Sequence, residues 1–208
     1  MEKHYYKNYF NAISKGLEST LYFANAKPVE SELFFKEIKL ILSELKEKRN
    51  KIFFFGNGAS AAFANHMALD FSKNGGILSR SLSDSALLTA LANDYSYEQS
   101  MVEFLKIEQA TKDDLIITIS SSGNSPNIIN ALNYAKASKI QSLSLSGLKS
   151  DNKSIKLSNH SIYVPMKTYG MVECIHQVLL HLMLDESMGI SEWDRSDYQN
   201  MSIKNFNL

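Results

Sequence analysis

Apolar residues along the chain follow two patterns, one typical of helices and one typical of buried strands. In the first 50 residues, two sets recur at helical spacing: Tyr5, Phe10, Ile13 and Leu17, and then Leu33, Ile38, Ile41 and Leu45. We therefore expect two N-terminal helices, separated by Pro28. From residue 51 onward, short apolar runs alternate with helical segments. The runs predict strands at 51–55, 78–82, 115–119, 141–145 and 161–164, and the segments predict helices at 59–73, 85–92, 97–110, 126–138 and 169–187.

Strands that alternate with helices across short turns predict an α/β fold, with a parallel sheet covered by helices on both faces. Five such strands suggest a flavodoxin-like, doubly wound sheet. In a 2-1-3-4-5 strand order, the strands at 51–55 and 115–119 flank the switch point, where ligands bind beyond the carboxyl ends. We expect one domain. Its parts are N-terminal helices (1–50) that pack on the core or at an oligomer interface, the core (51–188), and a tail (189–208) containing Trp193.

Composition narrows the classes of partner. The 208 residues carry 22 basic and 22 acidic side chains, so the formal net charge is zero and no nucleic-acid partner is expected. The only cysteine, Cys174, cannot form an internal disulfide. The start of the chain is charged, and no apolar run reaches the roughly 18 residues of a membrane span. We expect a cytoplasmic protein with no membrane association.

Two predicted strands end in turns rich in glycine, serine and asparagine, and each turn leads into a helix. The first turn is Gly56-Asn-Gly-Ala-Ser60, and the second is Ser120-Ser-Ser-Gly-Asn-Ser125. A helix N-terminus offers unpaired N–H groups and the positive end of the helix dipole, and serine hydroxyls add neutral donors. This chemistry suits an oxyanion, so the two turns predict a phosphate site.

Other interpretations of each turn remain open. Residues 56–61 also match the loose dinucleotide pattern G-x-G-x-x-G/A, with Asp84 as a candidate ribose ligand. The second turn alone could be a helix cap, with Ser125 or Asn124 as the capping residue and Pro126 at the first helical position. A cap and an anion site use the same geometry, so these two roles are compatible.

Titratable side chains gather on two of the predicted helices. His66 and Asp70 lie four residues apart, on one helix face, where they could bind a metal, transfer protons or form an ordinary surface pair. The late helix carries Glu173, His176 and His181 among apolar residues, where charged groups are costly unless partnered. We interpret His176 as a core or interface histidine.

Taken together, these motifs resemble the sugar isomerase (SIS) domain family, and within it the phosphoheptose isomerases. The resemblance covers nearly the whole chain. It rests on the G-N-G-x-S turn at 56–60 with His66, the N-D-Y-x-Y segment at 93–97, the S-x-S-G-N-S turn at 120–125, and Glu173 with His181.

The resemblance implies a role for each of these residues. Phosphate would bind at Ser60, Ser120, Ser122 and Ser125, with the sugar near Asn57, Asp94 and Asn124. Aldose–ketose isomerisation proceeds through an enediol and needs a base and an acid, here Asp70 and His181. Some members bind zinc, and the matching ligands are His66, Asp70, Glu173 and His181. Members form homotetramers, use no nucleotide cofactor, and interconvert sedoheptulose 7-phosphate and D-glycero-D-manno-heptose 7-phosphate for lipopolysaccharide or capsule heptose.

The chain departs from the family pattern at three places. Asp70 replaces a glutamate, Glu173 replaces a glutamine, and Tyr169-Gly-Met171 replaces a Thr/Asp-x-Arg stretch. Two outcomes are open: Glu173 takes over as the base, or the two carboxylates hold a divalent cation together with His66 and His181. A related phosphosugar as substrate, a non-catalytic sugar-phosphate sensor or partner protein, and a nicotinamide oxidoreductase are the alternative functions.

Overall fold

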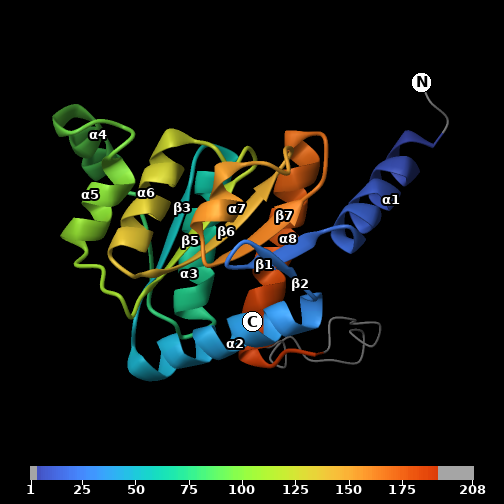
Figure 1. Ribbon diagram of the computed structural model, residues 1–208, viewed down its shortest axis with the longest axis horizontal. Coiled ribbons are helices and arrows are strands. Elements are labelled where there is room, and N and C mark those ends of the chain that lie inside the picture. Colours follow the sequence, from blue (N-terminus) through green and yellow to red (C-terminus); the bar gives the residue numbers. More distant parts are fainter. Residues whose placement is uncertain (1–3, 192–208) are drawn as a thin grey trace, which may run out of the picture.

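The computed structural model describes residues 4–191 as one mixed sheet between two layers of helices (Figure 1). The strands are β1 (Leu21–Ala24), β2 (Lys27–Val29), β3 (Ile52–Gly56), β4 (Ser79–Ser81), β5 (Leu115–Ser120), β6 (Gln141–Gly147) and β7 (His160–Val164). The helices are α1 (Tyr5–Glu18), α2 (Ser31–Lys48), α3 (Ala59–Lys73), α4 (Ser85–Asp94), α5 (Ser100–Ile107), α6 (Pro126–Ala137), α7 (Lys153–Leu157) and α8 (Tyr169–Met188). The predicted tail lies outside the described residues from 192 onward, Trp193 included.

The predicted parallel sheet is confirmed, and so is its strand order. Seven strands lie in the order β2-β1-β7-β6-β5-β3-β4, and the last five of these are parallel to one another. Numbered along the chain, these five strands have the order 2-1-3-4-5. The switch point therefore lies between β3 and β5, which are the strands that lead into the two serine-containing turns.

A hairpin in the N-terminal region differs from the prediction. The first 50 residues contain the two expected helices, but β1 and β2 form an antiparallel hairpin between them, and β1 pairs with β7. The sheet therefore has two more strands than predicted. Pro28 lies in β2 at the sheet edge, where its missing N–H group leaves no ladder bond unmade.

The core has two parts because alternate residues of each buried strand face opposite sides of the sheet. Ile52 and Phe54 of β3 pack with α2, α3 and α8, whereas Phe53 and Phe55 pack with α4, α5 and α6. Continuous apolar strands of this kind are typical of a parallel sheet buried on both faces. Helix α1 projects from the body and is largely exposed (Figure 1).

Candidate active site

The first turn brings strand β3 directly into helix α3. Gly58 adopts a positive φ of 57°, which favours glycine, and a side chain on Gly56 would overlap the carbonyl of Ser60. The backbone N–H of Ser60 donates to the Asn57 carbonyl at 3.1 Å, and the Ser60 side chain is buried. The two glycines thus allow a sharp turn that places Ser60 in the first turn of α3.

The second turn joins β5 to α6, and its hydroxyl groups face one another. Ser125 is the N-cap residue and Pro126 is the first helical residue, as predicted, but the Ser125 side chain makes no cap hydrogen bond. Its Oγ lies instead 3.4 Å from Ser120 Oγ. Gly123, with φ of 61°, closes the turn, because its N–H donates to the Ser120 carbonyl at 2.9 Å. The hydroxyl that could cap the helix is available to a ligand.

The two turns lie side by side at the carboxyl ends of β3 and β5. Gly56 is the register partner of Ile119, so Asn57 and Ser120 follow directly on neighbouring strands. The side chain of Asn57 also reaches α6, the helix that follows the second turn, since its Nδ2 donates to Asn127 Oδ1 at 2.9 Å. The sheet register therefore places the two turns next to each other, as the strand order predicts.

Two residues assigned to the sugar have other contacts in this structure. Asn124 Oδ1 accepts from the Lys153 N–H at 3.0 Å, and Asn124 Nδ2 donates to the Ser122 carbonyl at 3.0 Å, so this side chain fixes the turn itself. Asp94 is exposed at the end of α4, where Oδ1 accepts from Asn93 Nδ2 at 2.9 Å. Asp84, the candidate ribose ligand, caps α4 by accepting from the Leu87 N–H at 2.7 Å.

A second polar group lies where α3 faces α8. His66 Nε2 is 3.3 Å from Asp70 Oδ2, and the His66 and His181 rings have centroids 5.4 Å apart. Asp70 is less exposed to solvent than His66: 16% of the Asp70 side chain is exposed, and 47% of the His66 side chain. The predicted His–Asp pair and the late-helix histidine are thus brought together, although 111 residues separate His181 from Asp70.

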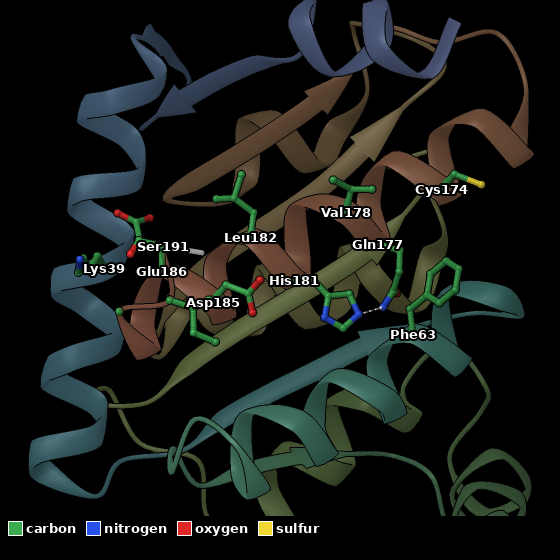
Figure 2. A pocket seen from close by; sticks show the side chains of 12 residues that line it. Lys39, Phe63, Cys174, Gln177, Val178, His181, Leu182, Asp185, Glu186 and Ser191 are labelled. Atoms are coloured by element: carbon green, nitrogen blue, oxygen red, sulfur yellow. Dashed lines mark hydrogen bonds between the residues drawn. The ribbon is translucent and has the colours of Figure 1, made fainter. Parts of the chain in front are cut away.

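Gln177 contacts the His181 ring. Its Nε2 lies 2.8 Å from His181 Nε2, one helical turn away (Figure 2). An amide nitrogen can only donate, so His181 Nε2 is the acceptor in this contact. The other amide atom, Gln177 Oε1, is buried with no hydrogen-bond partner in the described structure. The sequence pattern did not single out Gln177, although its i, i+4 spacing from His181 was a usable signal.

The ligand atoms of His66, Asp70 and His181 all lie within 4.8 Å of one another. Imidazole nitrogens and a carboxylate oxygen are ligands that bind zinc, and three protein ligands leave a position for a substrate oxygen. Among the described residues, Glu173 does not belong to this group. It lies half-buried on α8, two turns before His181.

A broad cavity of about 1020 Å³ opens beside His181, between α8, α2 and α3. Figure 2 shows His181, Gln177 and Phe63 at one end, and Lys39, Glu186 and Ser191 at the other. Of the three residues in the titratable group, His181 borders this open space. In the described part of the chain, the helices are too short or too polar to cross a bilayer.

A doubly wound sheet, paired serine-containing turns at its switch point and an adjacent His/Asp group together define an α/β domain suited to a phosphorylated small molecule. Residues 22–147 match the family model for the SIS domain, and the chain belongs to this family.

Curated relatives point to one branch of the family. The phosphoheptose isomerase of Helicobacter pylori (strain Shi470) is 36% identical over 148 residues, which is 67% of this chain and 74% of the relative. Phosphoheptose isomerase 2 of Campylobacter jejuni is 37% identical over 140 residues, or 64% of this chain and 69% of the relative. The solved phosphoheptose isomerase from Neisseria gonorrhoeae superposes with a TM-score of 0.74 at 24% identity, covering 88% of this chain and 95% of that one.

Proposed function

We propose that this protein is a phosphosugar aldose–ketose isomerase that interconverts sedoheptulose 7-phosphate and D-glycero-D-manno-heptose 7-phosphate. The proposal rests on two observations: the turns are adjacent at the carboxyl ends of β3 and β5, and the His66–Asp70–His181 group lies on α3, which begins at the first turn, and on α8. The curated relatives named above, at 36–37% identity, support the choice of a heptose phosphate. This product would serve the synthesis of lipopolysaccharide or capsule heptose.

The turns provide the phosphate subsite in this proposal. Ser120 and Ser125 present hydroxyl donors 3.4 Å apart, while Ser122 and Ser60 lie on the same two turns. The N-termini of α3 and α6 add the positive ends of their dipoles. In this proposal the phosphate is held at the turns, and the reacting end of the sugar extends to the His66–Asp70–His181 group.

The proton transfer falls to Asp70 and His181. Removing the proton from C1 of the ketose and protonating O2 gives the enediol. Removing the proton from O1 and protonating C2 then gives the aldose, so the reaction is balanced without a co-reactant. Asp70 is the better placed base, because its carboxylate lies within the ligand-atom group whereas Glu173 does not. His181, whose imidazole ring lies beside the His66–Asp70 pair, is suited to exchange a proton with the substrate oxygens. Gln177 orients its ring.

A divalent metal fits the same group. We infer that zinc would be held by His66, Asp70 and His181, and when bound it would stabilise negative charge on the substrate oxygens. The unpaired Gln177 Oε1 lies beside these ligands as a further neutral oxygen donor. The resemblance implies Glu173 as the fourth ligand. In this proposal Gln177 takes that place, because Gln177 contacts His181 whereas Glu173 lies outside the group of ligand atoms.

We propose that copies of the chain assemble into a homotetramer. Support comes from α1, which projects from the body and exposes the aromatic residues Tyr5, Tyr6 and Phe10 (Figure 1). Exposed apolar surface of this kind usually marks an interface. Light scattering on the purified chain tests the proposal: a mass near four times 23.4 kDa supports it and a monomer contradicts it.

The activity is tested by supplying the purified chain with sedoheptulose 7-phosphate and following the aldose heptose 7-phosphate by NMR. Fructose 6-phosphate and ribulose 5-phosphate serve as matched ketose phosphates of other lengths. We expect turnover of the heptulose phosphate, and loss of turnover in Ser120→Ala and His181→Ala. Turnover of a shorter ketose phosphate alone would transfer the proposal to that sugar. Binding without turnover of any ketose phosphate would contradict an isomerase.

A further inference from the structure

Three residues form a closed hydrogen-bonded cluster beside the two turns. Asn57 Nδ2 donates to Asn127 Oδ1 at 2.9 Å, and Asn127 Nδ2 donates back to Asn57 Oδ1 at 2.8 Å. The Tyr97 hydroxyl donates to the same Asn57 Oδ1 at 2.8 Å. We call Asn57, Asn127 and Tyr97 the amide clasp.

The clasp joins three segments that are distant in the sequence. Asn57 belongs to the first turn, Asn127 to the first turn of α6, and Tyr97 to the segment between α4 and α5. Asn130, one turn along α6, donates to the Glu98 carbonyl at 3.0 Å, so α6 holds the Tyr97 segment at a second point. Both phosphate turns and the segment beside them are therefore held in one arrangement.

The hydrogen bonds of the amide clasp leave one N–H of Asn57 free for a ligand. Asn127 is only 2% exposed, so its amide needs partners inside the protein: Asn57 bonds to both ends of it, and the Ile128 N–H also donates to its Oδ1 at 3.0 Å. The Asn57 Oδ1 accepts two hydrogen bonds, which uses both of its lone pairs. Nδ2 uses one of its two protons. One N–H of Asn57 remains, and its direction is fixed by the other three bonds.

We propose that Asn127 and Tyr97 are positioning residues, which hold Asn57 so that its free N–H and the Ser120–Ser125 hydroxyls bind the same phosphosugar. The inference rests on the proposed function and deepens it, since it says how the first turn is aligned with the second. Asn57 therefore donates one hydrogen bond to the substrate and accepts none from it. Neither Asn127 nor Tyr97 touches the reacting carbons in this account.

The test compares KM and kcat for sedoheptulose 7-phosphate in three variants of the full chain. Tyr97→Phe removes one hydroxyl from a residue that is 50% exposed, so it is expected to fold normally, and KM should rise about fivefold. Asn127→Ala removes both amide bonds, and KM should rise by roughly tenfold or more. The value of kcat should change little in both, because the lost interaction acts equally on ground state and transition state.

Asn133→Ala is the matched control, because Asn133 lies on the same helix with an exposed side chain. Its KM should equal the wild-type value. A double variant isolates the indirect role: if Asn127 acts through Asn57, adding Asn127→Ala to Asn57→Ala should raise KM by less than about twofold. If Asn127 had a purely structural role, Asn127→Ala would lower the unfolding temperature, and its effect on KM would not depend on the presence of Asn57.

The clasp is overturned if Tyr97→Phe and a folded Asn127→Ala both keep the wild-type KM. It is also overturned if Asn127→Ala raises KM by the same factor with and without Asn57. If Asn127→Ala does not fold, the Tyr97→Phe result decides alone. The dissociation constant for sedoheptulose 7-phosphate, measured by calorimetry, gives the same comparison without turnover. A wild-type chain that binds this sugar but does not convert it would refute the isomerase and leave the clasp to be judged on affinity.

Discussion

Gly123→Ala should damage both the stability of the protein and its affinity for sugar phosphates. Gly123 has φ of 61°, and an added Cβ would lie 2.9 Å from Asn152 Cβ and overlap the amide of Asn152. Asn152 is 1% exposed, and its Nδ2 donates to the Lys149 carbonyl at 2.8 Å and to Ser146 Oγ at 3.2 Å. The substitution must therefore displace a buried, hydrogen-bonded side chain.

The expected loss has two contributions. A left-handed conformation costs a residue with a Cβ about 1–2 kcal/mol. Displacing Asn152 loses three hydrogen bonds with a net value of about 1 kcal/mol each: the two from Nδ2 and the cap of α7, in which Oδ1 accepts from the Ile155 N–H. The free energy of unfolding should fall by about 4 kcal/mol, and KM should rise because the Ser154 N–H and hydroxyl, which both donate to the Gly123 carbonyl, would no longer hold the turn.

Gly189→Ala is the control for the first contribution alone. Gly189 has φ of 74°, and a Cβ there would meet no atom within 4 Å. Its variant should lose about 1 kcal/mol. Urea unfolding of both variants gives the difference directly. Equal losses in the two variants, or an unchanged KM in Gly123→Ala, would refute the reasoning that Asn152 supports the phosphate turn.

Three further outcomes are expected. Asp70→Asn and His181→Ala should each lower kcat by roughly 10²- to 10⁴-fold without a comparable loss of unfolding temperature; activity that survives in both would remove these residues from the chemistry. Zinc should raise the unfolding temperature of the wild type but not of His66→Ala, and an equal rise in both would place the metal elsewhere. Burial lowers the pKa of His176 to about 4, so the unfolded state binds more protons between pH 4 and 6.5, and stability should fall by about 3 kcal/mol as the pH drops through that window. His176→Gln should flatten this dependence in thermal unfolding, and an unchanged slope would assign it to other groups.

The parallel sheet could be predicted because its signal is local and strong. Strand β3 is apolar on both faces, and a helix follows it after a short turn, which is the pattern of a buried parallel strand. The hairpin could not be predicted in the same way. Its second strand is three residues long, contains Pro28, and follows a turn in which both Asn25 and Ala26 have positive φ. Pairing with β7 stabilises it, and that pairing is not visible in the local sequence.

The candidate site likewise contains features that the local sequence predicts and features that depend on the tertiary structure. Serine-containing turns can be recognised locally, because their residues bind and cap through neighbouring backbone groups. The amide clasp depends on the register of β3 against β5, which brings Asn57 to a partner 70 residues away. The family pattern pointed to Glu173, whereas the structure places Gln177 against His181. Which side chain reaches a site is set by the helix phase once α8 is packed.

In the proposed reaction, Asp70 and His181 transfer protons on a phosphosugar that is held by the two turns. The most direct measurement is deuterium incorporation from D₂O when sedoheptulose 7-phosphate is incubated with the wild type, read by NMR. The account predicts an aldose heptose 7-phosphate labelled at C2, deuterium at C1 of the recovered ketose, and no label with Asp70→Asn. Unlabelled sugar from a wild-type protein that binds the substrate would contradict it.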